Sequence, residues 1–85
     1  RSLLNNKLSN EIRDILLKLL KIDNKNIPSI IDTESAENWD SLNHLMIIEE
    51  ISKKYNIKIP TSDSINLLSE KEIINYLEQK IKERE

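Results

Sequence analysis

Residues 39–60 read WDSLNHLMIIEEISKKYNIKIP, and this stretch decides which fold the chain can adopt. Its apolar residues recur at intervals of three and four, which predicts an amphipathic helix that starts at Asp40 or Ser41 and ends near Tyr55. Asp40 is a suitable N-cap because its carboxylate can accept hydrogen bonds from exposed amides of the first turn. Pro60 prevents the helix from resuming. The predicted apolar stripe consists of Leu42, Leu45, Ile48, Ile51 and Tyr55, with Ile47 widening it.

Two more main helices are expected, one on each side of this stretch. The first runs from Leu3 to Ile22, where the turn-forming sequence DNKNIP follows and ends it. The last begins at SEKE, residues 69–72, which has the pattern of a capping box, and continues to about Lys82, with the charged end KERE expected to fray. The apolar stripes of these two helices are Leu8, Ile12, Ile15, Leu16, Leu19 and Ile22 in the first, and Ile73, Ile74, Leu77 and Ile81 in the last. The residues predicted to be core are Leu16, Leu19, Ile48, Ile51 and Leu77.

A long connection, residues 23–40, separates the first two helices. Ile27, Ile30 and Ile31 are expected to hold it against the bundle. Residues 61–68, TSDSINLL, have room for one or two helical turns. The predicted fold class is therefore all-α, a small bundle of three main helices plus one short helix with a long first loop, in a single domain over residues 1–85. A loop of this length in so small a domain is often functional.

The composition excludes several kinds of protein. Net charge is −2 with no long run of either sign, so the basic footprint of a nucleic-acid-binding protein is absent. There is no cysteine, and His44 is the sole histidine, which excludes disulfides, cysteine-based sites and a histidine-cluster metal site. No apolar run approaches the roughly 20 residues that span a bilayer, and no signal-peptide pattern is visible. A soluble, monomeric, cytoplasmic protein is expected.

Ser41 admits three interpretations: a residue that merely starts a helix, a nucleophile, or an attachment point. His44 lies three residues on and could be its neighbour on one helix face. A nucleophile, however, also needs an orienting group for its base, an oxyanion hole and a pocket that excludes water. No glycine-rich elbow precedes Ser41, and the chain is too small for a separate pocket. Hydrolase chemistry is therefore disfavoured, and no catalytic residue is predicted.

The whole arrangement resembles the acyl carrier proteins, whose attachment signature is Asp-Ser-Leu at the start of their second helix. The stretch NEIRDILLKLLKID is similar to the family's first helix, WDSLNHLMIIEEISKKYNIKIP to its second helix and the Ile-Pro that follows, and SEKEIINYLEQKI to its last helix. The resemblance thus covers nearly the whole chain. Asp-Ser-Leu alone is a weak signal, and its context makes it specific.

The resemblance implies a carrier without enzymatic activity. A phosphopantetheinyl transferase would move 4′-phosphopantetheine from coenzyme A onto Ser41, and an acyl-loading ligase or acyltransferase would charge the arm with an acyl or aminoacyl group as a thioester. A phosphodiester at a helix N-terminus is physically favourable. By the same resemblance, Asp40 would help the transferase hold its metal ion. Leu42 would dock in an apolar pocket of the transferase, with a core position as the alternative.

The sequence departs from the family pattern just before the motif. Asn38 stands where fatty-acid-synthesis carriers commonly have glycine, and asparagine is expected to preserve the turn because it tolerates a left-handed backbone. Trp39 replaces a small residue, and core cover is favoured for it over an aromatic anchor for a partner.

The second helix also lacks the strong acidity typical of the family. Its polar side offers Asn43, His44, Met46, Ser52, Lys53 and Lys54, with only Asp40, Glu49 and Glu50 acidic. Met46 could be an adaptable partner contact or a core-edge residue. His44 is grouped with Asp40, Leu42 and Met46 as a candidate for partner recognition. Because complementary charge governs partner choice, a specialised pathway is expected rather than general fatty-acid synthesis. Surface-glycan acylation, a secondary-metabolite route and aminoacyl transfer are the candidates, and an unmodified helical interaction module or a general carrier is the alternative.

Overall fold

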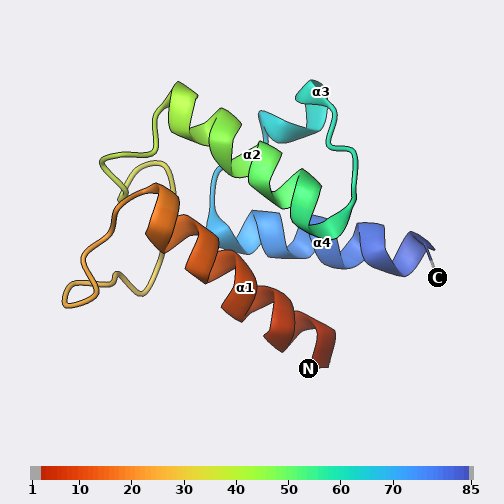
Figure 1. The fold of residues 1–85 in the computed structure, drawn as a ribbon, viewed down its shortest axis with the longest axis horizontal. Coiled ribbons are helices and arrows are strands. Elements are labelled where there is room, and N and C mark those ends of the chain that lie inside the picture. The colour runs from red at the N-terminus through yellow and green to blue at the C-terminus, as the bar shows by residue number, and fades with distance from the viewer. Residues whose placement is uncertain (1–2, 85) are drawn as a thin grey trace.

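Four helices make up the fold in a computed structural model that describes residues 3–84. They are α1 (Leu3–Leu19), α2 (Ser41–Tyr55), α3 (Thr61–Ser64) and α4 (Glu70–Arg84). Figure 1 shows α1, α2 and α4 as the body of the bundle, with the short α3 beside α2 and the long first loop at one end. The all-α prediction of three main helices, one short helix and a long first loop is confirmed.

The core forms where the apolar stripes of the three long helices meet. The fully or nearly fully buried residues of the helices are Leu8, Ile12, Ile15 and Leu16 on α1, Ile47, Ile48 and Ile51 on α2, and Ile73, Ile74 and Leu77 on α4. Loop residues Leu20, Ile31, Ala36, Trp39, Ile57 and Leu67 complete the cluster. Of the five predicted core residues, Leu19 is the exception, since it is only half-buried and the adjacent Leu20 is buried instead.

The predicted apolar stripe of α2 is wrong in its first turns. Leu42 and Leu45 are 67% and 64% exposed, whereas Ile47 and Ile51 are fully buried. Figure 1 gives the reason, because the start of α2 stands at the upper edge of the bundle, away from α1 and α4. Periodicity identifies a stripe, but only the neighbouring helices determine how much of it is covered.

α1 ends earlier than predicted, at Leu19 rather than Ile22. Lys21 takes a left-handed conformation (φ 54°), and the amide of Ile22 donates to the carbonyl of Leu17 at 3.0 Å, which is the bonding of a Schellman motif. Asn56 takes the same conformation (φ 52°) after α2, and the amide of Ile57 donates to the carbonyl of Ser52 at 3.1 Å. Both turns form without glycine, which the chain lacks.

The long first loop is held by fewer isoleucines than predicted. Ile31 is buried, but Ile27 and Ile30 are exposed, and the segment is also fixed by backbone hydrogen bonds. The amide of Glu70 donates to the carbonyl of Ile31 at 2.8 Å, and that of Thr33 to the carbonyl of Leu68 at 3.0 Å. The loop is therefore bonded to the start of α4 and to the residues just before it.

Both ends of α4 are fixed by polar side chains. The serine half of the predicted capping box is confirmed, since the Ser69 hydroxyl accepts from the Glu72 amide at 3.1 Å. The Glu72 carboxylate accepts from the Ser69 hydroxyl at 3.1 Å instead of from the Ser69 amide. The helix ends at Arg84, two residues beyond the predicted end at about Lys82. The Arg84 guanidinium donates to the carbonyls of Tyr55 and Asn56 at 2.9 and 3.0 Å, and these bonds order the turn expected to fray. The last residue of KERE lies outside the described residues.

Candidate functional site

Ser41 is the first residue of α2 and is exposed. The cap of this helix is Asp40, whose Oδ1 accepts from the amide of Asn43 at 2.9 Å, as predicted. No hydrogen bond of the Ser41 hydroxyl is found within residues 3–84, so capping does not occupy it. The amides of Ser41 and Leu42 belong to the first turn, where backbone donors have no acceptor inside the helix.

Asn38 preserves the turn before Ser41, but not by the predicted left-handed backbone. Within the described range, positive φ occurs at Lys21 and Asn56. Instead, the Asn38 side chain donates to the carbonyl of Leu20 at 2.7 Å, and its own carbonyl accepts from the Asn43 side chain at 2.6 Å. A side-chain amide thus bonds the entry of α2 to the end of α1, a function that glycine could not supply.

Trp39, His44 and Ser64 are joined by two consecutive hydrogen bonds, which we call the Trp39–His44–Ser64 bridge. The indole Nε1–H of Trp39 donates to His44 Nδ1 at 2.9 Å, and the two rings stack with centroids 6.1 Å apart. His44 Nε2 lies 2.8 Å from the carbonyl oxygen of Ser64. Because an indole only donates and a carbonyl only accepts, the two bonds form together when His44 accepts at Nδ1 and donates from Nε2. The bridge thus joins the long loop, α2 and α3.

The bridge decides between the two interpretations of Trp39. Its side chain is only 6% exposed, so it is core cover, as favoured from the sequence. His44, grouped from the sequence with the partner contacts, is half-buried and has both ring nitrogens engaged. Its contact with α3 was not anticipated, because Ser64 lies twenty residues away in the chain.

A groove of about 510 Å³ opens beside Ser41, between α2 and α3. Its lining is largely apolar and consists of Thr33, Trp39, Asp40, Ser41, His44, Leu45, Thr61, Ser64, Ile65 and Leu68. The sequence interpretation missed the α3 side of this groove. The available signal was weak, two apolar residues three apart in TSDSINLL at Ile65 and Leu68, and both remain exposed.

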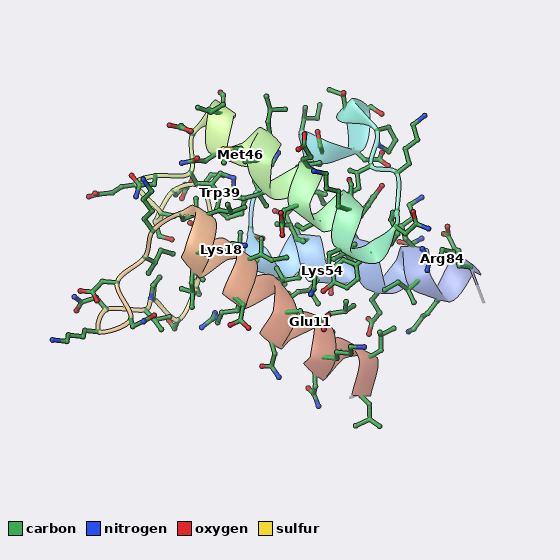
Figure 2. All side chains as sticks on the ribbon, in the orientation of Figure 1. Glu11, Lys18, Trp39, Met46, Lys54 and Arg84 are labelled. Carbon is green, nitrogen blue, oxygen red and sulfur yellow. The ribbon has the colours of Figure 1, made fainter. Side chains whose placement is uncertain are left out.

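Five exposed apolar side chains line the groove or follow a lining residue directly in the chain, and we call this set the apolar rim. Its members are Leu42, Leu45, Met46, Ile65 and Leu68. Met46 is 46% exposed, which excludes a core position, and Figure 2 shows it near the start of α2. Leu42 is likewise outside the core. Clustered exposed apolar groups mark a surface that binds something apolar.

The charges further along α2 largely neutralise one another. Lys53 lies 3.5 Å from Glu49 on the same helix, and Lys18 of α1 lies 3.8 Å from Glu50. Figure 2 shows Lys18 and Lys54 on neighbouring helices. Exposed pairs of this kind contribute little to stability, but they reduce the acidic field that α2 presents.

α3 is also bonded to α4. The hydroxyl of Tyr76 on α4 donates to the Asp63 carboxylate at 2.7 Å. Burial and this carboxylate together raise the pKa of Tyr76 to about 12. The equivalent contact of α2 with α1 is the bond from the Tyr55 hydroxyl to Glu11 at 2.7 Å, and burial with this bond raises the pKa of Tyr55.

Neither a metal-binding cluster nor a membrane-spanning helix occurs in the part of the chain that the structure describes. Residues 3–84 hold no group of three or more His, Asp or Glu side chains placed to bind a metal ion. In the same range, no helix has the length and apolar character needed to cross a membrane.

The fold and the sequence around Ser41 place the chain in the class of small helical carrier proteins. Curated relatives define it further. The chain is 35% identical over 75 residues to an acyl carrier protein of Brachyspira hyodysenteriae, covering 85% of this chain and 94% of the relative. It is 33% identical over 75 residues to one from Campylobacter hominis (80% and 86%) and 28% identical over 72 residues to one from Campylobacter concisus (81% and 90%). The chain belongs to the acyl carrier protein family, whose members are carriers rather than enzymes.

Comparison with models of protein families found no match. Members of the acyl carrier protein family generally carry phosphopantetheine and work with transferases and acyl-handling enzymes. The resemblance stated from the sequence is thereby confirmed at the level of the family and of a general carrier role.

Proposed function

We propose that this chain, as one carrier domain, holds acyl groups on a 4′-phosphopantetheine arm attached to Ser41 and delivers them to the enzymes of a specialised pathway. The observation that carries the proposal is that the Ser41 hydroxyl is exposed and takes no part in capping the helix. It is exposed at the first residue of α2, and Asp40 rather than Ser41 caps the helix. A hydroxyl in this position can be modified without loss of a structural bond.

The surroundings of Ser41 suit this arm. The free amides of the first turn and the positive end of the helix dipole favour the phosphodiester that would join the arm to Ser41. The arm supplies a terminal thiol that can hold an acyl group as a thioester, a function that a chain without cysteine lacks. The groove beside Ser41 offers apolar surface to what the arm carries.

The residues next to Ser41 suit recognition by a phosphopantetheinyl transferase. Asp40 is exposed, so its carboxylate can face a metal ion held by the transferase. Leu42, which is exposed rather than core, would dock in an apolar pocket of that enzyme. Met46 extends the same apolar rim toward later partners, among them an acyl-loading ligase or acyltransferase.

The charge distribution favours a specialised pathway. Because Glu49 and Glu50 are paired with lysines, α2 lacks the acidic face that enzymes of general fatty-acid synthesis would recognise. Acylation of a surface glycan, a secondary-metabolite route and aminoacyl transfer remain the candidate pathways. A cytoplasmic location also remains a prediction.

Co-expression with a broad-specificity phosphopantetheinyl transferase, followed by intact-mass measurement, tests the attachment. We expect the mass to rise by one 4′-phosphopantetheine group in the wild type and not in Ser41→Ala, with the same helical circular dichroism for both. Ser62→Ala, an exposed serine on α3, is the matched control and should still be modified. A wild type that gains no mass would favour the unmodified interaction module, and a modified Ser41→Ala variant would place the attachment elsewhere.

A further inference from the structure

The Trp39–His44–Ser64 bridge forms the inner wall of the groove beside Ser41. All three residues line the groove. Trp39 and Ser64 are buried and His44 is half-buried, whereas Ser41 and the apolar side chains of the lining are exposed. The bonds of 2.9 and 2.8 Å therefore cross the side of the groove that faces the interior.

The packed core lies directly behind this wall. One turn further along α2 from His44 come Ile47 and Ile48, and three residues after Ser64 comes Leu67, all of them buried. The bond of 2.8 Å between His44 and Ser64 joins α2 to α3 next to these core residues in the chain, so a carbon chain that passed between the two helices at this point would have to part them.

Several bonds oppose that separation. Parting the two residues would remove the acceptor of the His44 Nε2–H and the donor to the Ser64 carbonyl, and polar groups left unpaired away from water are costly. α3 cannot easily tilt as a unit, because the Tyr76 hydroxyl on α4 holds Asp63 at 2.7 Å. The Ser64 hydroxyl also donates to the carbonyl of Thr61 at 3.0 Å, which stiffens this single turn.

We propose that the Trp39–His44–Ser64 bridge acts as a latch that keeps the group carried on Ser41 out of the core, and so restricts this carrier to short acyl groups. This inference rests on the proposed attachment at Ser41. A short acyl group lies in the groove against Leu45, Ile65 and Leu68, at the surface. A longer chain stays at this open surface, where its additional methylene groups remain in contact with water and are not buried in the core.

The test measures thermal unfolding as a function of acyl length. The wild type is loaded by the transferase from the coenzyme A thioesters of acetyl, butyryl, hexanoyl, octanoyl and decanoyl groups, and each form is verified by intact mass. His44→Leu, similar in size but unable to form either bond of the bridge, is loaded in the same way. Thr33→Val, a change in the groove lining outside the bridge, is the matched control.

We expect the midpoint of the wild type and of Thr33→Val to stop rising after the shortest acyl groups. In His44→Leu it should keep rising with length, by up to roughly 3–6 °C for each further buried methylene group in a domain of this size. Methyl NMR of decanoyl forms gives a second readout. The signals of Ile47 and Ile48 should be unmoved in the wild type and shifted in His44→Leu, while those of Leu45 and Ile65 shift in both.

His44→Met, which also lacks both bonds of the bridge and has a more flexible side chain, serves in place of His44→Leu if that variant fails to fold. A wild-type midpoint that rises as steeply with length as that of the variant would overturn the latch. A variant whose midpoint is as independent of acyl length as that of the wild type would also overturn the latch, because a feature other than the bridge would then exclude the acyl chain from the core. Failure of the proposed function is distinguishable, since an unmodified Ser41 appears in the mass before any acyl form is compared.

Discussion

The two halves of α2 contain the same kinds of residue and use them in opposite ways. In the second half, Ile47, Ile48 and Ile51 are buried against the other helices. In the first, Leu42 and Leu45 have the same spacing and face solvent. Only the surroundings differ, because α1 and α4 cover one half and not the other. One helix thus provides both a core element and an exposed apolar surface, and the boundary between them lies between Met46 and Ile47.

The largest effect should come from truncating the buried half. Ile51→Ala should lower the free energy of unfolding by about 2–5 kcal/mol, because it opens a cavity in a fully packed core. Leu45→Ala, the same kind of change in the exposed half, should stay within roughly 0.5 kcal/mol. Denaturant unfolding of the two variants measures the difference. Equal losses would show that the faces of α2 are assigned incorrectly.

Next in size is the cap between loop and helix. Asp40→Ala should destabilise the fold by about 1 kcal/mol, since the Asn43 amide loses its acceptor. Ser41→Ala removes no hydrogen bond and should leave the denaturation midpoint unchanged. A midpoint lowered equally by both substitutions would mean that Ser41 shares the capping role.

A smaller effect is expected from the charges at the end of α2. Lys53→Glu combined with Lys54→Glu should raise the rate at which general fatty-acid enzymes load the modified carrier several-fold, and more so at low salt, because exposed charges are screened. The matched control is Lys7→Glu with Lys25→Glu, the same change in net charge away from α2. Transfer rates over a salt series decide the matter. Efficient loading of the wild type by these enzymes would identify a general carrier. An equal increase of the loading rate in the control would show that net charge, and not the charges of α2, determines the rate.

The smallest expected effect is at alkaline pH and concerns the contact of α3 with α4. The pKa of Tyr76 is raised from 10 to about 12, so the neutral phenol is favoured in the folded state. Its contribution to stability is complete below pH 10 and is lost as pH rises toward 12. Tyr76→Phe should remove this part of the pH dependence. The urea midpoints of the wild type and of Tyr76→Phe are measured across that pH range. The same dependence of the midpoint on pH in both proteins would contradict this prediction.

The elements of the fold were largely predictable because they depend on local patterns. The capping box at Ser69, the cap at Asp40 and the breaks around Pro60 are all specified within a few residues. The errors about burial share one cause, which is that coverage by distant segments is not a local property. Leu42, Leu45 and Ile30 fit apolar patterns equally well and are exposed, whereas Leu20, outside the predicted stripe, is buried.

The candidate site likewise has one part that the sequence could predict and one part that it could not. Ser41 and its neighbours lie in one continuous motif, so the sequence contains the signal. The groove is not part of a continuous motif, because it forms only when TSDSINLL packs beside α2. The bridge depends on His44 meeting a backbone carbonyl, and any residue type has a carbonyl, so no sequence pattern marks Ser64 as its partner.

The two left-handed turns at Lys21 and Asn56 have a consequence for the unfolded chain. A protein without glycine has fewer backbone conformations to lose on folding, since each glycine costs roughly 0.5–1 kcal/mol more than alanine in lost freedom. Against this stands the left-handed conformation, at about 1–2 kcal/mol for an ordinary side chain and less for asparagine. At Asn56 the entropy saved by the absence of glycine and the cost of the left-handed conformation nearly cancel. At Lys21 the cost of the left-handed conformation is the larger of the two. A small part of the ordering cost of this carrier is therefore avoided before folding begins, at the expense of local strain where α1 ends.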